Sequence, residues 1–172
     1  MKQRIVILGT TGSGKTTLAK RLSKKLGIPH VELDALYWNP NWVETEVKPF
    51  REKIKNALDQ ETWVVDGNYS KGRDLIWPKA QTVIWLNYSF FTILRQICKR
   101  TFANSKAKKE LWPGCPETFH KQLLTKDSIF VWFLRSYWKK RRTIPEYLKE
   151  YPDLRVIRVR SPKELDEKLS SL

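Results

Sequence analysis

Short apolar runs alternate with amphipathic stretches along this chain of 172 residues. Short runs rich in Val, Ile and Trp predict strands, and apolar residues spaced three or four apart predict helices. Strands that alternate with helices are typical of an α/β fold with a parallel sheet. The strands are expected at 5–8, 30–34, 62–66, 82–87 and 154–159, and the main helices at 16–26, 46–59, from 90 onward, 128–142 and 162–169.

The run at 82–87 is apolar at every position except its two ends. A strand of this kind suits a parallel sheet that helices cover on both faces, because a sheet with one wet face would show alternation. The helix at 128–142 is rich in aromatic residues, and we expect its aromatic face to pack in the core.

The first strand leads into Gly9-Thr10-Thr11-Gly12-Ser13-Gly14-Lys15-Thr16, which fits the phosphate-loop pattern G-x-x-x-x-G-K-[ST]. Glycines let successive backbone N–H groups point inward, and the following helix adds its positive dipole end, so the loop can hold a polyphosphate. Lys15 is expected to reach the β- and γ-phosphates, Thr16 to coordinate Mg²⁺ and Thr17 to approach the α-phosphate. Since a strand precedes and a helix follows, we favour this interpretation over a plain glycine turn. The chain is predicted to bind ATP or GTP.

The second and third predicted strands each end in an acidic residue, Asp34 and Asp66. Ligands of open parallel sheets gather beyond the carboxyl ends of the strands, where the phosphate loop also lies. We expect Asp34 to face the transferred phosphate and Asp66 to hold Mg²⁺, with Gly67 letting the backbone approach the ligand. Asp66-Gly67-Asn68 is also a good turn, so both interpretations stay open for these residues alone. Trp38, in an aromatic loop after the second strand, could stack on a substrate ring or simply pack.

Positive charge is concentrated in one part of the chain. The net charge is +15, and residues 91–142 carry 13 basic but only 3 acidic side chains. Such a segment suggests an anionic partner, which is the nucleotide, an anionic substrate or a nucleic acid backbone; a solvated surface is the plain alternative. Arg95 and Arg100, on the helix after the fourth strand, are candidates to hold phosphate oxygens.

A single domain over 1–172 is the natural count for this length. Residues 101–127 interrupt the alternation with a basic stretch and a turn cluster, and we expect a mobile lid segment there. Two cysteines make no disulfide framework and no apolar signal region precedes the first strand, which indicates a cytoplasmic protein. The longest uncharged stretch, 80–94, is shorter than a membrane span, so no membrane association is expected.

The order of these motifs resembles the nucleoside monophosphate kinase family, which includes the adenylate kinases. More narrowly, three segments are similar to the adenylate kinase-like proteins labelled DNA topology modulation proteins: Leu33-Asp34-Ala35-Leu36-Tyr37-Trp38, Val65-Asp66-Gly67-Asn68-Tyr69-Ser70 with Arg73, and Val83-Ile84-Trp85-Leu86. The resemblance covers nearly the whole chain. It implies a P-loop NTPase fold with a five-stranded parallel sheet, helices on both faces and a helical lid, with ATP on the phosphate loop. The acceptor would bind among Asp34, Trp38, Asp66, Gly67, Asn68 and Arg73.

The chain departs from true adenylate kinases at two places. Its second strand runs into Asp34-Ala35-Leu36-Tyr37-Trp38 in place of the Thr-Gly-Asp stretch usual at the AMP site, and the lid lacks their paired arginines. AMP is therefore not implied as the acceptor. An acid at the end of the second strand also resembles shikimate and gluconate kinases, where that position orients or deprotonates a hydroxyl acceptor.

The expected activity is Mg²⁺-dependent transfer of the γ-phosphate of ATP to a small acceptor, either a nucleotide or a hydroxyl compound. Lys15 and Asp34 are expected to act in catalysis, with Arg95, Arg100 and Arg141 closing over the phosphates. The alternative is a nucleic-acid-binding NTPase or regulator acting on DNA topology, which the basic segment suggests. The chain carries no recognised nucleic-acid-binding motif, so we expect at most weak, non-specific binding.

Overall fold

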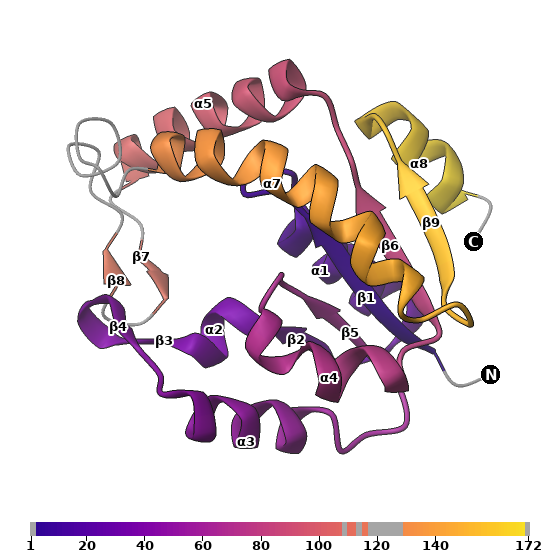
Figure 1. The fold of residues 1–172 in the computed structure, drawn as a ribbon. Helices are drawn as coiled ribbons and strands as arrows, with labels where there is room; N and C mark the ends of the chain where they lie inside the picture. Colours follow the sequence, from indigo (N-terminus) through magenta and orange to yellow (C-terminus); the bar gives the residue numbers. More distant parts are fainter. Residues whose placement is uncertain (1–2, 108–109, 113–114, 117–128, 171–172) are drawn as a thin grey trace.

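A parallel five-stranded sheet forms the centre of the molecule (Figure 1). The computed structural model describes residues 3–107, 110–112, 115–116 and 129–170. The strand order is β2-β5-β1-β6-β9, and every neighbouring pair is parallel. The five predicted strands are therefore confirmed, with the strand before the phosphate loop at the centre. They are β1 (Arg4–Gly9), β2 (His30–Glu32), β5 (Trp63–Asp66), β6 (Thr82–Leu86) and β9 (Arg155–Val159).

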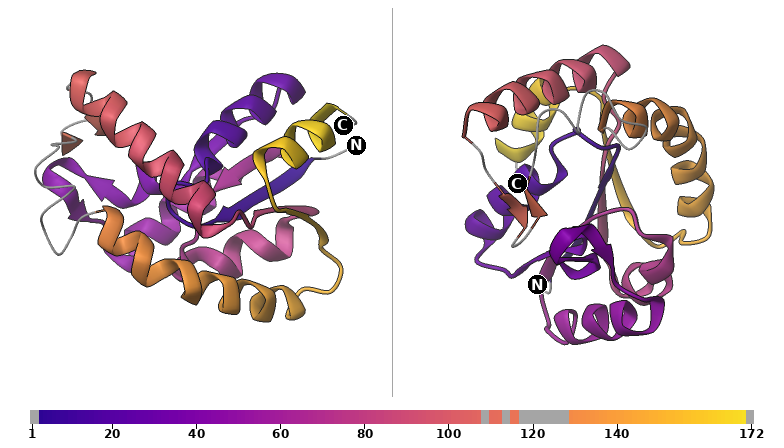
Figure 2. Two further views of the ribbon diagram at one scale, coloured as in Figure 1. Left: turned by 90° about the horizontal axis from the view of Figure 1, so that it is seen from above. Right: turned by 90° about the vertical axis from the view of Figure 1, so that its left-hand side faces the viewer.

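Helices cover both faces of this sheet (Figure 2). Successive residues of a strand point to opposite faces, so Ile7 of β1 joins one core, while Val6 and Leu8 join the other. The first core includes side chains of α1, α5 and α8, the second includes those of α3 and α4, and α7 contributes to both. The predicted α/β fold is confirmed. The helices are α1 (Lys15–Leu26), α3 (Val47–Ala57), α4 (Arg73–Ile76), α5 (Phe90–Ala107), α7 (Ile129–Lys149) and α8 (Pro162–Ser170).

The second strand is shorter than its sequence pattern predicts. It ends at Glu32, and α2 (Leu33–Tyr37) begins at once, so Asp34 lies in the first turn of a helix and not at the end of a strand. Leu33 and Tyr37 are both buried, and their spacing of four residues gives this short helix an apolar face. The expected aromatic loop is a small hairpin in which β3 (Trp38–Asn39) pairs with β4 (Val43–Glu44).

Helix α7 is longer than expected. Its predicted end at 142 is wrong, since the helix continues to Lys149 and passes through Pro145. Proline removes one backbone hydrogen bond from a helix interior. Packing offsets that loss, because buried Ile144 and partly buried Tyr147 continue the inward face of the helix.

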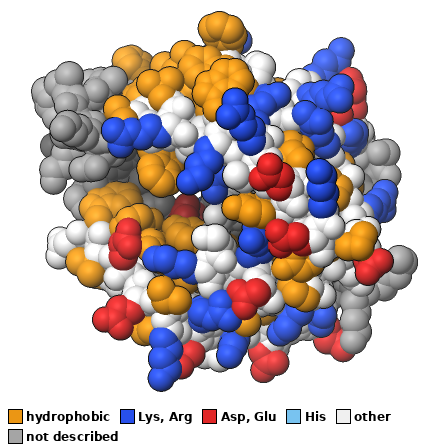
Figure 3. All heavy atoms as spheres, in the orientation of Figure 1, with side chains coloured by type: hydrophobic (Ala, Val, Ile, Leu, Met, Phe, Trp, Pro, Cys, Tyr) orange, Lys and Arg blue, Asp and Glu red, His pale blue; other side chains and the backbone are white. Residues whose placement is uncertain are grey.

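The aromatic residues of α7 divide between the core and the surface. Phe133 and Tyr137 are buried as expected, whereas Trp132 and Trp138 are 60% and 62% exposed. The expectation of an aromatic core face is therefore correct for Phe133 and Tyr137, with Phe130 partly buried against the same core, and wrong for the two tryptophans. Figure 3 shows hydrophobic and basic side chains gathered along the upper part of this face, where α5 and α7 lie.

Part of the expected lid lies within the described residues. Residues 101–107 form the last turns of α5, and β7 (Glu110–Trp112) pairs with β8 (Cys115–Pro116). The rest of 101–127 lies outside the described residues, so the assignment of this segment as a lid stays a prediction. Within the described parts of the chain, no helix is long and apolar enough to cross a membrane.

Candidate active site

The phosphate loop joins β1 to α1 in a turn that requires two of its glycines. Gly12 and Gly14 have φ angles of 77° and 88°, in the left-handed region that glycine adopts without strain. A side chain at Gly12 would also collide with Ile97 of α5. The Lys15 ammonium group donates to the Thr10 carbonyl at 3.1 Å, so it lies over the loop that it is predicted to serve.

Lys15 lies among charges of both signs. Burial lowers its pKa, while the carboxylates of Asp34 and Asp66 oppose that shift. The guanidinium of Arg100 acts in the same direction as burial, and α5, which carries it, packs on the loop through Ile97 at Gly12. The surroundings of Lys15 thus favour its charged form less than water does. A phosphate group in the loop would restore that balance.

The Thr16 hydroxyl and the Asp66 carboxylate meet beside the loop. Thr16 donates to Oδ2 of Asp66 at 2.7 Å and lies 3.5 Å from a carboxylate oxygen of Glu32. The other oxygen of Asp66, a buried residue, contacts Nε2 of His30 at 2.6 Å. Burial raises the pKa of Glu32, and the charge of Asp66 adds to that shift. The structure therefore brings the two predicted metal ligands together, with an acidic neighbour.

These oxygen groups suit Mg²⁺. This ion is usually held by one or two carboxylates together with water and substrate phosphates, not by a full cage of protein ligands. The described residues contain no group of three His, Cys, Asp or Glu side chains that could hold a metal ion. Thr16 and Asp66 fit the predicted role.

Asp34 is held in place by a tyrosine. The Tyr69 hydroxyl donates to Oδ1 of Asp34 at 2.6 Å. Burial raises the pKa of Tyr69 well above its ordinary value, and the charge of Asp34 adds to the shift, so this hydroxyl stays protonated as a donor. Within the described part of the chain, Oδ2 of Asp34 accepts no hydrogen bond, and the action of Asp34 on an acceptor stays a prediction.

Asn68 braces the phosphate loop. Its side-chain amide donates to the Gly9 carbonyl at 2.5 Å, and its Oδ1 accepts from the Gly9 N–H at 3.4 Å. The preceding Gly67 has a φ angle of 138°, and a side chain there would meet Leu33 at 2.8 Å. Asn68 therefore contacts the loop backbone directly, while acceptor contacts by Gly67 and Asn68 stay predictions.

The arginines predicted to close over the phosphates occupy different surroundings. Arg95 is exposed on α5, whereas Arg100 is partly buried and influences Lys15. Arg141 donates to the Tyr88 carbonyl at 3.2 Å and to the Tyr137 hydroxyl at 2.7 Å, so it ties α7 to the segment after β6. A catalytic role for Arg95, Arg100 or Arg141 stays a prediction.

Lys140 of α7 faces the site instead. Its ammonium group donates to the Asn68 carbonyl at 3.4 Å. Burial lowers the pKa of Lys140, and the charge of Lys15 adds to the shift. Lys140 of α7 thus contacts Asn68, the residue whose side chain is bonded to Gly9 of the phosphate loop.

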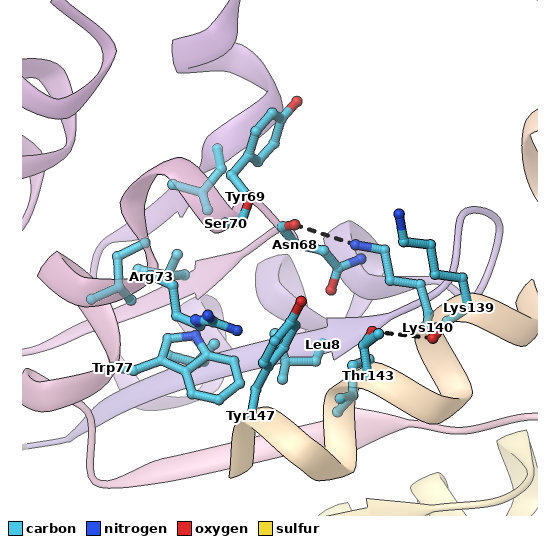
Figure 4. A pocket seen from close by; sticks show the side chains of 16 residues that line it. Leu8, Asn68, Tyr69, Ser70, Arg73, Trp77, Lys139, Lys140, Thr143 and Tyr147 are labelled. Atoms are coloured by element: carbon cyan, nitrogen blue, oxygen red, sulfur yellow. Dashed lines mark hydrogen bonds between the residues drawn. The ribbon is translucent and has the colours of Figure 1, made fainter. Parts of the chain in front are cut away.

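A cavity of about 160 Å³ lies between the sheet, α4 and α7 (Figure 4). Its apolar floor comes from β1 and β5, and its charged lining consists of Arg73, Lys139 and Lys140, with no acidic side chain among the described residues that line it. The guanidinium of Arg73 lies 3.5 Å from the ring centre of Tyr147 and 5.8 Å from that of Trp77. Nη1 of Arg73 is buried without a hydrogen-bond partner among the described residues. A buried cationic donor in this state suits an anionic ligand.

Trp38 packs within the small hairpin. Its ring meets those of Tyr37 and Trp42 edge-on, with centroids 5.2 and 5.6 Å apart. The structure thus gives this side chain a packing role, and its stacking on a substrate stays a prediction.

Sequence reasoning did not assign roles to His30, Glu32, Tyr69 or Lys140. His30 and Glu32 flank buried Val31 in β2, so strand alternation places them on the same face, and that signal was available. Lys140 stands in a run of four cations that composition cannot tell apart. Its role depends on the packing of α7.

A family model described as an AAA domain matches residues 5–111, more than half of the chain. The chain belongs to this AAA domain family. The matched region contains the phosphate loop, Asp34, Asp66 and Arg73. Lys140 and the rest of α7 lie beyond it.

Two bacterial proteins resemble parts of the chain. The uncharacterized protein YqaC of Bacillus subtilis (strain 168) is 36% identical over 69 residues, which is 39% of this chain and 39% of that protein. An adenylate kinase of Mycobacterium sp. (strain MCS) is 39% identical over 56 residues, 33% of this chain and 31% of that protein. The chain therefore spans only about two fifths and one third of the length of these relatives.

Solved structures match almost the whole chain. A sugar kinase from Janibacter sp. HTCC2649 covers 99% of this chain and 94% of its own, with 18% identity and a TM-score of 0.56. A shikimate kinase from Aquifex aeolicus covers 98% and 95%, with 17% identity and a TM-score of 0.55. At such identities the likeness shows the fold, which is that of P-loop kinases. The narrower resemblance to DNA topology modulation proteins stays a prediction.

Proposed function

We propose that this protein is a Mg²⁺-dependent kinase that transfers the γ-phosphate of ATP to a hydroxyl group of a small anionic acceptor. The proposal rests on one arrangement. The short segment 66–73 forms hydrogen bonds to the phosphate loop and to Asp34, and it also lines the cationic cavity. Membership of the AAA domain family and the P-loop kinase fold support the reaction class.

The phosphate loop binds the nucleotide through its backbone N–H groups and the start of α1. Lys15 places a positive charge beside the phosphates, and Lys140 of α7 supplies a second positive charge. Thr16 and Asp66 hold Mg²⁺, which neutralises charge on the phosphate oxygens. Because phosphoryl transfer involves little covalent participation by the protein, these charges and their positions supply most of the rate.

Asp34 acts on the acceptor. Its Oδ2 accepts a hydrogen bond from the acceptor hydroxyl and takes the proton as the hydroxyl oxygen bonds to the γ-phosphorus and ADP leaves. The charge of Asp34, which opposes the fall in the pKa of Lys15, supports this assignment.

The cavity favours a small acceptor with a negative group. Its volume of about 160 Å³ is close to that of a cavity that admits a benzene-sized molecule, which favours a small hydroxy acid over a nucleoside monophosphate. Arg73 is preorganised on Tyr147 and can present its planar fork to a carboxylate or phosphate group. The apolar floor would pack against the body of the acceptor.

The test is a screen for ADP release from Mg·ATP in the presence of sugar acids, other small hydroxy acids, nucleoside monophosphates and double-stranded DNA. We expect small hydroxy acids to stimulate ADP release. For the stimulating compound, Arg73→Ala should raise KM at least about tenfold, since it removes a charge-assisted hydrogen bond.

Arg73→Lys separates geometry from charge, because lysine keeps the charge and loses the planar fork. Lys79→Ala, which removes an exposed cation outside the cavity, is the matched control and should leave KM unchanged. Stimulation by nucleoside monophosphates alone, or by DNA alone, would refute the small-acid acceptor.

A further inference from the structure

We infer that Tyr69 is a positioning residue that fixes the Asp34 carboxylate for the acceptor hydroxyl, an inference that rests on the proposed function. Tyr69 is one of the residues that line the cavity, and its hydroxyl donates a hydrogen bond to Oδ1 of Asp34 at 2.6 Å. It therefore connects the place where the acceptor binds to the group that acts on it.

The tyrosine itself is immobilised from two directions. Its ring packs against Tyr37 of α2 and Phe50 of α3, with centroids 4.7 and 5.2 Å away. The backbone leading to it is fixed because the neighbouring Asn68 is bonded to the phosphate loop. A hydroxyl held in this way limits the rotation of the carboxylate that accepts from it. The orientation of Oδ2 of Asp34 thus depends on a chain of contacts that runs from the phosphate loop through Asn68 and Tyr69.

Electrostatics explains why such a hold is needed. Asp34 and Lys15 attract each other, yet no ion pair joins them among the residues that the structure describes. Without the Tyr69 hydroxyl, Asp34 would be free to turn toward Lys15. A direct pair would tie up both the group that acts on the acceptor and the cation that serves the phosphates.

Tyr69→Phe tests this directly, because it keeps the packed ring and removes the hydrogen bond. Tyr37→Phe is the matched control: it also removes one buried hydroxyl, but that hydroxyl contacts Glu44 and Lys71, not Asp34. ADP release from Mg·ATP is measured without an added acceptor, when only water can accept the phosphate, and with gluconate or shikimate as acceptor probes. A crystal structure of the unsubstituted protein and of Tyr69→Phe accompanies the assay.

We expect Tyr69→Phe to lower kcat about ten- to hundredfold at an unchanged KM for ATP, whereas Tyr37→Phe stays within about twofold. In the Asp34→Asn background Tyr69→Phe should cause no further loss, because both act through one group. The unsubstituted crystal should show the Tyr69 hydroxyl on Asp34, and the variant should show Asp34 turned.

Three results would overturn the inference. Tyr69→Phe and Tyr37→Phe could lose equal kcat, or the losses of kcat could multiply in the variant that combines Asp34→Asn with Tyr69→Phe. The third is a crystal structure of the unsubstituted protein in which Tyr69 does not contact Asp34. If Asp34→Asn leaves turnover intact, the proposed function fails. If Asp34→Asn abolishes turnover but Tyr69→Phe does not reduce it, only the role of Tyr69 fails. The crystals decide the contact even when no probe stimulates ADP release.

Discussion

Replacement of Lys140 by methionine should separate two assignments on α7. The sequence predicts Arg141 as one of three arginines that close over the phosphates, whereas the geometry favours Lys140, which lies beside Asn68 and influences Lys15. Methionine keeps most of the apolar stem and removes the charge. A hydrogen bond to a charged group contributes about 1.5–3 kcal/mol, and each 1.36 kcal/mol corresponds to a tenfold change in rate. Lys140→Met should therefore lower kcat/KM for ATP about ten- to hundredfold.

Arg141→Met is the comparison, because it removes a neighbouring charge that is bonded to Tyr88 and Tyr137. It should lower stability by about 1–3 kcal/mol and the Tm by several degrees. Steady-state kinetics and thermal unfolding of both variants decide between the assignments. Normal turnover in Lys140→Met, together with a large loss of turnover in fully folded Arg141→Met, would refute the geometric reasoning and restore the assignment from sequence.

Four further outcomes are expected. Lys15→Ala should reduce phosphoryl transfer at least about a hundredfold and leave the circular dichroism spectrum unchanged, because its charge serves the transition state. Asp34→Asn should depress kcat far more than ATP affinity, as measured by kinetics and calorimetry; an equal loss of both would contradict its action on the acceptor. Asn68→Ala should lower the free energy of unfolding in urea by about 1–3 kcal/mol, since Gly9 loses its partners. DNA affinity should be weak and fall by orders of magnitude between about 50 and 200 mM salt while ATP affinity changes little, and tight, sequence-selective DNA binding would favour the regulator instead.

The elements of the fold could be predicted because their signals are local. Each strand and each long helix carries its own apolar period, and the phosphate loop has fixed spacing. The position of Asp34 in a helix could not be predicted from local signals. Its helix forms because Leu33 and Tyr37 are buried beneath α3 and neighbouring elements, which is a tertiary effect that local propensity does not contain.

The acceptor side depends on contacts between residues far apart in sequence. The resemblance to adenylate kinase-like proteins indicated Arg73, but its stacking on Tyr147 joins α4 to α7 and leaves no local pattern. Lys140 is one of four consecutive cations that the sequence does not distinguish. The burial of Phe133, Tyr137 and Ile144 sets the rotation of α7 and thereby places Lys140 beside the site. Spacing can find a loop that binds phosphate. The choice among similar side chains needs the packed structure.

The charges of the site suggest why nucleotide and metal should bind as one complex. Burial and the charge of Asp66 raise the pKa of Glu32, so the acidic side of the phosphate loop is already crowded with negative charge. On the other side, burial and mutual repulsion lower the pKa of Lys140 next to Lys15. A bare triphosphate would relieve the lysines and add to the repulsion among the carboxylates, while a bare cation would do the reverse. Mg·ATP would present its phosphates to the lysines and its metal to the carboxylates, and this matching of opposite charges supports Mg·ATP as the substrate of the proposed kinase.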